Sequence, residues 1–175
     1  MQKSITKKLA RFKTYLILIA GAATIIIIAA HFLSVETYLT LLSTNNGRVF
    51  ARLPLGEGSE FSIEFVHSVN QTPVRDAFVI SGKEIHPVAT YFHAFGAGMQ
   101  TELEHGQVLH HHEDGSMSIT GFTQSFTQLN YIVGTVSDHI LIINGERLSL
   151  RELCGSNAAV TFKTEERLRF EFKRE

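Results

Sequence analysis

The sequence predicts an all-β fold, an antiparallel β-sandwich or partly open barrel of about ten short strands, preceded by one N-terminal transmembrane helix. Apolar and polar residues alternate in many short runs, as in a strand with one buried face. Glycine- and asparagine-rich turn signals separate these runs every 8–12 residues or so. A long uncharged segment, residues 14–33, accounts for the transmembrane helix.

The expected strands follow one another almost without interruption. The stretch "EFSIEFVH" shows the alternation clearly, because Phe61, Ile63 and Phe65 share one face while Ser62 and Glu64 share the other. A short helix is the one expected exception, in residues 149–155. The expected strands are residues 37–42, 48–55, 60–67, 74–80, 84–92, 107–112, 116–122, 126–134, 139–144, 146–150, 159–163 and 167–172.

The N-terminal region indicates export. Residues 1–13 carry five Lys and Arg and no acid, which predicts a cytoplasmic basic segment. Residues 14–33 are then a transmembrane anchor, or a signal sequence cleaved after Ala29-Ala30. In either case residues 36–175 form an exported β domain, on the periplasmic or extracellular side of a membrane crossed once.

The net charge of the chain argues against nucleic acid as a partner. The chain has 16 Lys and Arg and 17 Asp and Glu, so residues 14–175 keep 11 cations against 17 acids, a net charge of −6. Nucleic-acid binding needs a basic face, and we expect none here. Cys154 is the only cysteine, which excludes an internal disulfide.

The stretch "HSVNQTPVRD" predicts a corner between two strands. Pro73 cannot donate to a strand ladder, so one strand ends before it and the next begins beside it. The corner would bring together His67, Ser68, Thr72 and Asp76, and a turn containing Gly96, Gly98 and Met99 would cover it. Two interpretations remain open at this point: a structural corner, or a pocket wall that binds a ligand.

A catalytic interpretation of the same corner is weaker. Neighbouring residues in a strand point to opposite faces, so His67 and Ser68 cannot easily touch as base and nucleophile. No Gly-x-Ser-x-Gly elbow surrounds any serine. We therefore predict no catalytic residues, and we keep a hydrolase using His67, Ser68 and Asp76 as a distant alternative.

Two further motifs suggest ligands without specifying them. His110 and His112 share a face of one strand and could bind zinc, but two ligands are too few for a closed site. They precede Asp114-Gly115, which favours an exposed hairpin tip. The glycines of "FGAGMQTE" lack the third glycine of a dinucleotide fingerprint. We expect no cofactor and no dedicated metal site.

The corner and the glycine stretch together resemble the family called domain of unknown function 1850. The resemblance covers residues 39–172 and rests on His67-Ser68, Thr72-Pro73-Val74 with Asp76, and Gly96-Ala97-Gly98-Met99. Asp76 departs from the glutamate more usual at its position. The resemblance implies a small exported protein, often anchored in the bacterial inner membrane and typically encoded beside TAXI-type TRAP transporters. It supplies no catalytic or binding residues to carry over.

These observations lead to one functional expectation and two alternatives. We expect a non-enzymatic accessory protein of a TAXI-type TRAP transporter, in contact with the permease or its solute receptor. The first alternative is an exported module that binds a small ligand or a metal. The hydrolase is the second.

Overall fold

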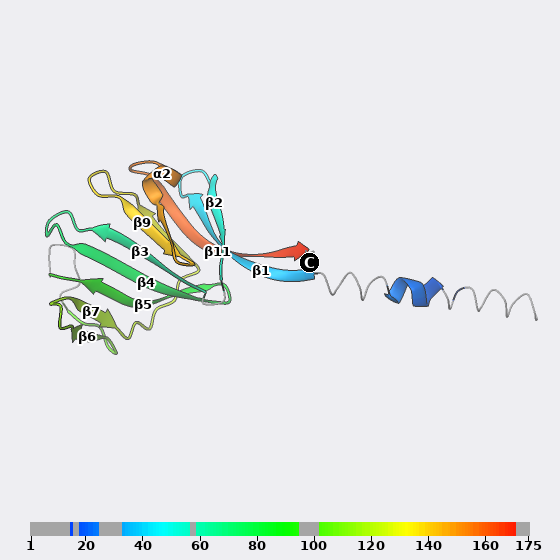
Figure 1. The fold of residues 1–175 in the computed structure, drawn as a ribbon, viewed down its shortest axis with the longest axis horizontal. Coiled ribbons are helices and arrows are strands. Elements are labelled where there is room, and N and C mark those ends of the chain that lie inside the picture. Colours follow the sequence, from blue (N-terminus) through cyan, green and yellow to red (C-terminus); the bar gives the residue numbers. More distant parts are fainter. Residues whose placement is uncertain (1–14, 16–17, 25–32, 57–58, 95–101, 171–175) are drawn as a thin grey trace, which may run out of the picture. The chain divides into compact units, whose positions relative to one another are not determined.

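A computed structural model describes residues 15, 18–24, 33–56, 59–94 and 102–170 of the chain (Figure 1). The chain divides into two compact units, Thr37–Glu166 and Met1–Glu36 with Arg167–Glu175. The described part consists of eleven strands and one labelled helix. These elements are β1 (Leu33–Ser43), β2 (Val49–Pro54), β3 (Glu60–Val66), β4 (Pro73–Ser81), β5 (Glu84–Phe92), β6 (Val108–His111), β7 (Met117–Thr120), β8 (Gln128–Ile132), β9 (His139–Ile143), β10 (Glu146–Ser149), α2 (Leu150–Cys154) and β11 (Ala159–Phe170).

The strands form two antiparallel sheets, which confirms a mostly β fold and is consistent with the predicted sandwich (Figure 1). The smaller sheet has the order β2-β1-β11-β8, and the larger has the order β10-β9-β3-β4-β5-β7-β6. Hairpins connect β3 to β4 and β4 to β5, so the middle of the larger sheet is built from neighbouring segments of sequence. The two predicted strands 159–163 and 167–172 are one continuous strand, β11, as far as Phe170.

The larger sheet has one apolar face, as the alternation predicted. Phe61 and Ile63 on β3 are buried beside Phe78 and Leu141 of the neighbouring strands. Phe162 of the smaller sheet stacks on Phe61, with 6.2 Å between the ring centroids. Aromatic packing between the sheets therefore holds the core together.

The helix α2 begins at a serine cap within the predicted range. The Ser149 hydroxyl accepts a hydrogen bond from the Glu152 amide at 3.0 Å, which satisfies one of the free amides of the first turn. Leu150 is fully buried and joins the core. The helix is thus fixed at its first residue both by its cap and by burial.

The other unit contains the N-terminal region, of which only part is described. Residues 18–24 are helical, and Arg169 pairs with Glu36 at 2.9 Å. Most of the predicted anchor, residues 14–33, and all of the basic segment 1–13 lie outside the described residues. Within the described ranges, no helix combines the length and the hydropathy needed to span a bilayer.

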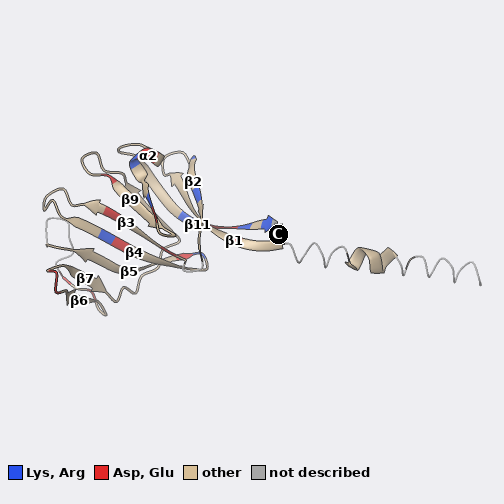
Figure 2. Cartoon of the chain, viewed as in Figure 1, with Lys and Arg blue, Asp and Glu red and all other residues tan. Residues whose placement is uncertain are grey.

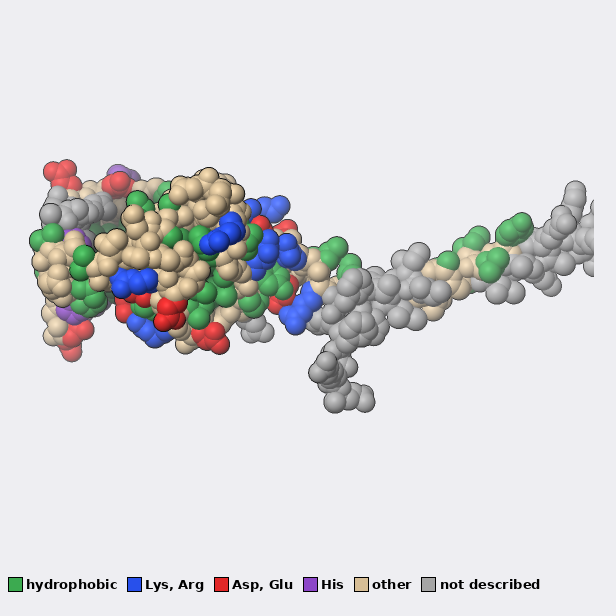
Figure 3. All heavy atoms as spheres, turned by 90° about the horizontal axis from the view of Figure 1, so that it is seen from above, with side chains coloured by type: hydrophobic (Ala, Val, Ile, Leu, Met, Phe, Trp, Pro, Cys, Tyr) green, Lys and Arg blue, Asp and Glu red, His purple; other side chains and the backbone are tan. Residues whose placement is uncertain are grey.

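Charged residues of both signs are distributed along the strands and loops (Figure 2). On the face shown in Figure 3, Lys and Arg side chains are interspersed with Asp and Glu side chains over the middle of the domain. Ion pairs such as Arg52–Glu165 and Arg147–Glu64 neutralise part of this charge. Charges of both signs are therefore mixed on this face.

Candidate functional site

Asp76 is a charged residue in an apolar row. It lies on β4 opposite Ile63 of β3, on the face that also carries Val74, Phe78 and Ile80. Val74 belongs to one apolar cluster and Phe78 to another, so the carboxylate lies between them. Residues of a strand alternate between faces, and this register points Asp76 toward the interior.

Two hydroxyl groups hold the Asp76 carboxylate. Thr90, directly opposite on β5, donates to Oδ1 at 2.8 Å. Tyr131, which comes from β8 of the other sheet, donates from its phenol to Oδ2 at 2.9 Å. The carboxylate therefore links the two sheets, and within the described residues no lysine or arginine bonds to it.

Burial controls the protonation of this pair. It raises the pKa of the Asp76 carboxyl above its ordinary value, and the hydrogen bonds from Thr90 and Tyr131 and the nearby His139 oppose that rise. Burial, together with the charge of Asp76, raises the pKa of the Tyr131 phenol strongly. Tyr131 thus stays a hydrogen-bond donor at all ordinary pH values.

His139 completes the cluster. It lies on β9 opposite Phe65, and the two rings stack with 4.9 Å between centroids. Its Nδ1 accepts a hydrogen bond from the Gly134 amide at 3.1 Å, which places the proton of the neutral ring on Nε2. Burial lowers the pKa of His139, against the opposing effects of Asp138 and Asp76.

Gly134 is needed for this arrangement. A Cβ atom at this position would lie 2.1 Å from the Ser137 carbonyl oxygen and 3.3 Å from Cε1 of His139. Only glycine lets the chain pass so close to the Ser137 carbonyl, two residues before His139.

A cleft of about 340 Å³ opens beside Asp76, a volume suited to a small molecule. We call it the Asp76 cleft. Among the described residues, its lining contains two carboxylates, those of Asp76 and Glu104, and no lysine, arginine or histidine. Its other polar groups come from Thr90, Gln107, Gln124, Asn130 and Tyr131, and its apolar walls from Ala77, Phe78, Pro87, Ala89, Phe122, Phe126 and Leu129.

The predicted corner is a second, separate hollow. The strands end at Val66 and resume at Pro73, and the His67 amide donates to the Thr72 carbonyl at 2.9 Å to close the hairpin. His67 and Ser68 line a cleft of about 330 Å³ together with Ser137 and His139. The hydroxyl oxygen of Thr72 is buried and has no hydrogen-bond partner in the part of the chain that the structure describes.

The structure does not place Asp76 in this corner. Asp76 lies opposite Ile63, four residues before His67, and four strand residues span about 13 Å. Both of its oxygens bond elsewhere, whereas Nδ1 of His67 accepts from the turn amides of Val69 and Asn70 at 3.3 and 3.4 Å. The expected convergence of Asp76 with His67 is therefore replaced by a cluster of Asp76 with Thr90 and Tyr131. The predicted cover residues Gly96, Gly98 and Met99 lie outside the described residues.

The two candidate metal ligands have hydroxyl partners. His110 and His112 bond through Nε2 to Thr120 and Ser118 of β7, each at 2.9 Å. In the described ranges, no three His, Cys, Asp or Glu side chains gather as metal ligands would.

Sequence reasoning missed Thr90, Tyr131 and His139. The alternation of "VRDAFVI" does contain one usable signal, because an acid between Val74 and Phe78 must face the interior. Such an acid needs hydroxyl or cationic partners. Tyr131 is a partner of that kind but is 55 residues away, in the other sheet.

The fold and this cluster define a class: a two-sheet β domain with an acidic cleft beside a carboxylate that bridges the sheets. The chain belongs to the family described as domain of unknown function (DUF1850), whose sequence profile matches residues 61–150. This confirms the family resemblance seen in the sequence. No curated protein and no solved structure shows a significant match to the chain.

Proposed function

We propose that this protein is a non-enzymatic extracytoplasmic binding module whose Asp76 cleft takes a small organic cation. The observation that carries the proposal is a half-buried carboxylate that, among the described residues, has no lysine or arginine partner and faces a cleft with a second carboxylate and no lysine, arginine or histidine in its lining. Withdrawing even part of an anion from water costs free energy, and a bound cation would offset that cost.

The walls favour an organic cation. Phe78, Phe122 and Phe126 line the cleft with aromatic rings, whose faces attract ammonium groups. A metal ion would need several converging ligands, whereas the Asp76 oxygens are already occupied by Thr90 and Tyr131. An alkylammonium can approach such a carboxylate without displacing those hydroxyls.

The same contacts argue against catalysis. Nδ1 of His67 is occupied by two turn amides, so that nitrogen is not available to take a proton from Ser68. Asp76 bonds to Tyr131 and Thr90 and orients neither of them as a nucleophile toward a base. We therefore propose a binding role and not hydrolysis.

We further propose that the domain works beside a TAXI-type TRAP transporter. Support comes from the family resemblance and from the sequence of residues 14–33, which we propose as the anchor. An anchor would confine the domain near the permease and raise its effective concentration there. The main domain would then lie outside the cytoplasmic membrane of a bacterium.

The first test is binding of simple amines. In the full-length chain, purified in a mild detergent, butylamine and tetramethylammonium should raise the melting temperature, while the neutral butanol should not. Asp76→Asn should weaken amine binding by about tenfold or more, since a charge-assisted contact is lost. Titration calorimetry measures this loss.

The matched control is Asp114→Asn. Asp114 is exposed at the β6–β7 turn, where it bonds to Ser116, and its replacement should leave amine affinity unchanged. Equal binding of butylamine by Asp76→Asn and the unaltered chain would refute the proposal. Equal stabilisation by butanol and butylamine would do the same.

The second test concerns the partner. Crosslinking of the full chain in its native membrane should recover a TRAP permease or its solute receptor. A variant with residues 14–33 replaced by an unrelated membrane-spanning helix should recover the same partner if the β domain makes the contact. Recovery of neither protein would contradict the accessory role and would leave the amine result intact.

A further inference from the structure

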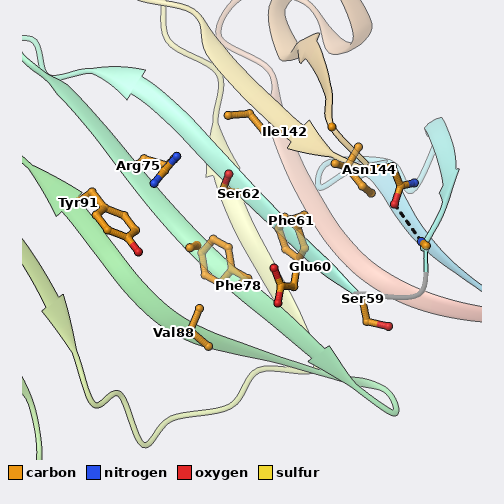
Figure 4. Close-up of a pocket in the computed structure, with 14 residues that line it drawn as sticks. Ser59, Glu60, Phe61, Ser62, Arg75, Phe78, Val88, Tyr91, Ile142 and Asn144 are labelled. Carbon is orange, nitrogen blue, oxygen red and sulfur yellow. Dashed lines mark hydrogen bonds between the residues drawn. The ribbon is translucent and has the colours of Figure 1, made fainter.

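The outer face of the larger sheet carries a second hollow, of about 540 Å³ (Figure 4). Because neighbouring residues of β4 alternate, Arg75 and Ala77 face this hollow while Asp76 faces the interior. The outer hollow and the Asp76 cleft therefore lie on opposite faces of the same strand.

Arg75 forms one end of the outer hollow. Its guanidinium lies over the ring of Tyr91, its neighbour on β5, at 4.5 Å from the ring centroid. A guanidinium placed over an aromatic ring can keep its N–H edge for a planar, bidentate partner. Within the described residues Arg75 has no ion pair and no other hydrogen-bonded partner.

Glu64, the acid placed to pair with Arg75, forms an ion pair with another arginine. Glu64 lies directly opposite Arg75 on β3, where oppositely charged residues normally pair. Its carboxylate instead accepts from Arg147 at 2.6 Å. Arg75 is therefore a cation with an open N–H edge at the end of a hollow.

The side chains that line the middle of the hollow are small or apolar. Ser62, Ala77, Val88 and Ile142 line it, and Val88 is 41% exposed. The Asn144-Gly145 turn borders it, and Asn144 is fixed by bonds from its amide to the Pro54 carbonyl at 2.7 Å and from the Gly56 amide at 3.0 Å. The floor thus offers apolar area beside a rigid rim.

The other end carries a negative charge. Glu60 lies four residues before Glu64 on β3, which places it about 13 Å from the Arg75 end (Figure 4). A ligand with carboxylates at both ends would meet repulsion there. The hollow is therefore matched to an anion at one end only.

We propose that the outer hollow binds a small monocarboxylate with an apolar body. The carboxylate takes the N–H edge of Arg75, and the aliphatic part lies over Ala77, Val88 and Ile142. Ala77 and Phe78 border both this hollow and the Asp76 cleft, but the two proposed sites use different charged groups, Arg75 here and Asp76 there.

Three molecules of equal length test the proposal on the full-length chain: hexanoate, the neutral hexanol and the dicarboxylate adipate. Hexanoate should bind more tightly than either of the others, as measured by titration calorimetry or saturation-transfer NMR. Arg75→Gln should weaken hexanoate binding by about tenfold or more, and Arg75→Lys by less, because lysine keeps the charge but loses the bidentate edge.

Variants of two other arginines serve as controls for the effect of Arg75→Gln. Arg52→Gln removes a paired arginine on β2 and should change nothing. Arg147→Gln should weaken hexanoate binding, because it releases Glu64 to pair with Arg75. Glu60→Gln should bring the affinity for adipate up to that for hexanoate.

Three results would overturn this proposal: no binding of hexanoate, equal binding of hexanoate and hexanol, or unchanged binding by Arg75→Gln. Asp76→Asn should leave hexanoate affinity intact, and Arg75→Gln should leave butylamine affinity intact. The two proposed sites can thus be refuted independently of each other.

Discussion

Replacing Phe162 with alanine is expected to lower the free energy of unfolding by about 3–5 kcal/mol. The Phe162 ring is fully buried. It stacks on Phe61 at 6.2 Å and meets Tyr131 edge-on at 5.9 Å between centroids. Its removal would leave a cavity where the two sheets pack together, and the surrounding strands could close it only in part.

Urea denaturation of the full-length chain in detergent measures this loss, and the melting temperature should fall by roughly 10 °C. The matched control is Ile132→Ala in the same sheet, because Ile132 is 66% exposed and should cost less than about 0.5 kcal/mol. Equal losses in the two variants would show that the packing of Phe162 against the larger sheet does not hold the domain together.

Much of this packing could be predicted from the sequence. The alternation of Phe61, Ile63 and Phe65 indicated which side of β3 is buried, because a strand has a side-chain period of two. The unbroken course of β11 could not be predicted. Residues 164–166 resemble a polar turn, but Glu165 pairs with Arg52 at 3.2 Å and Lys163 at 3.0 Å, so its charge is accommodated within the strand.

The candidate site was less accessible to sequence reasoning. Asp76 was singled out, but its nearness in sequence to His67 suggested the wrong partner. A hairpin separates residues along the strand as their distance from the turn grows, and Asp76 is three residues beyond the first residue of β4. Tyr131 reaches Asp76 only because the two sheets pack face to face. Local patterns do not encode that contact.

The second large effect is expected at Asp76 itself. Asp76→Ala should cost about 1–3 kcal/mol, because the hydroxyls of Thr90 and Tyr131 lose their acceptor. Tyr131→Phe in the Asp76→Ala background should recover part of the lost stability, because it removes a hydroxyl donor that Asp76→Ala leaves without an acceptor. Asp76→Asn removes the charge and turns one of the two acceptor oxygens into an NH2 donor, so either Thr90 or Tyr131 must accept instead of donate.

The ionisation of Asp76 should make stability depend on pH in a defined direction. Its folded pKa is raised above the ordinary 3.8, so the native state keeps a proton over a pH interval in which the unfolded chain has lost it. This contribution to stability is fully present below pH 3.8 and is lost as the pH rises through the folded pKa. The unaltered chain should therefore lose stability relative to Asp76→Asn over that interval.

His139 is a second group with a shifted pKa, and its effect must be separated from that of Asp76. Its folded pKa is lowered below 6.5, so its own contribution is present above pH 6.5 and is lost as the pH falls. Glu104 lines the same cleft and is common to every chain compared. Melting curves of the single variant His139→Gln and of the double variant His139→Gln with Asp76→Asn therefore isolate the carboxyl. If the difference between the two melting temperatures stays constant from about pH 4 to about pH 7, Asp76 is ionised throughout. The electrostatic basis of the proposed cation site would then be wrong, because a carboxylate that ionises without cost has no need of a cation.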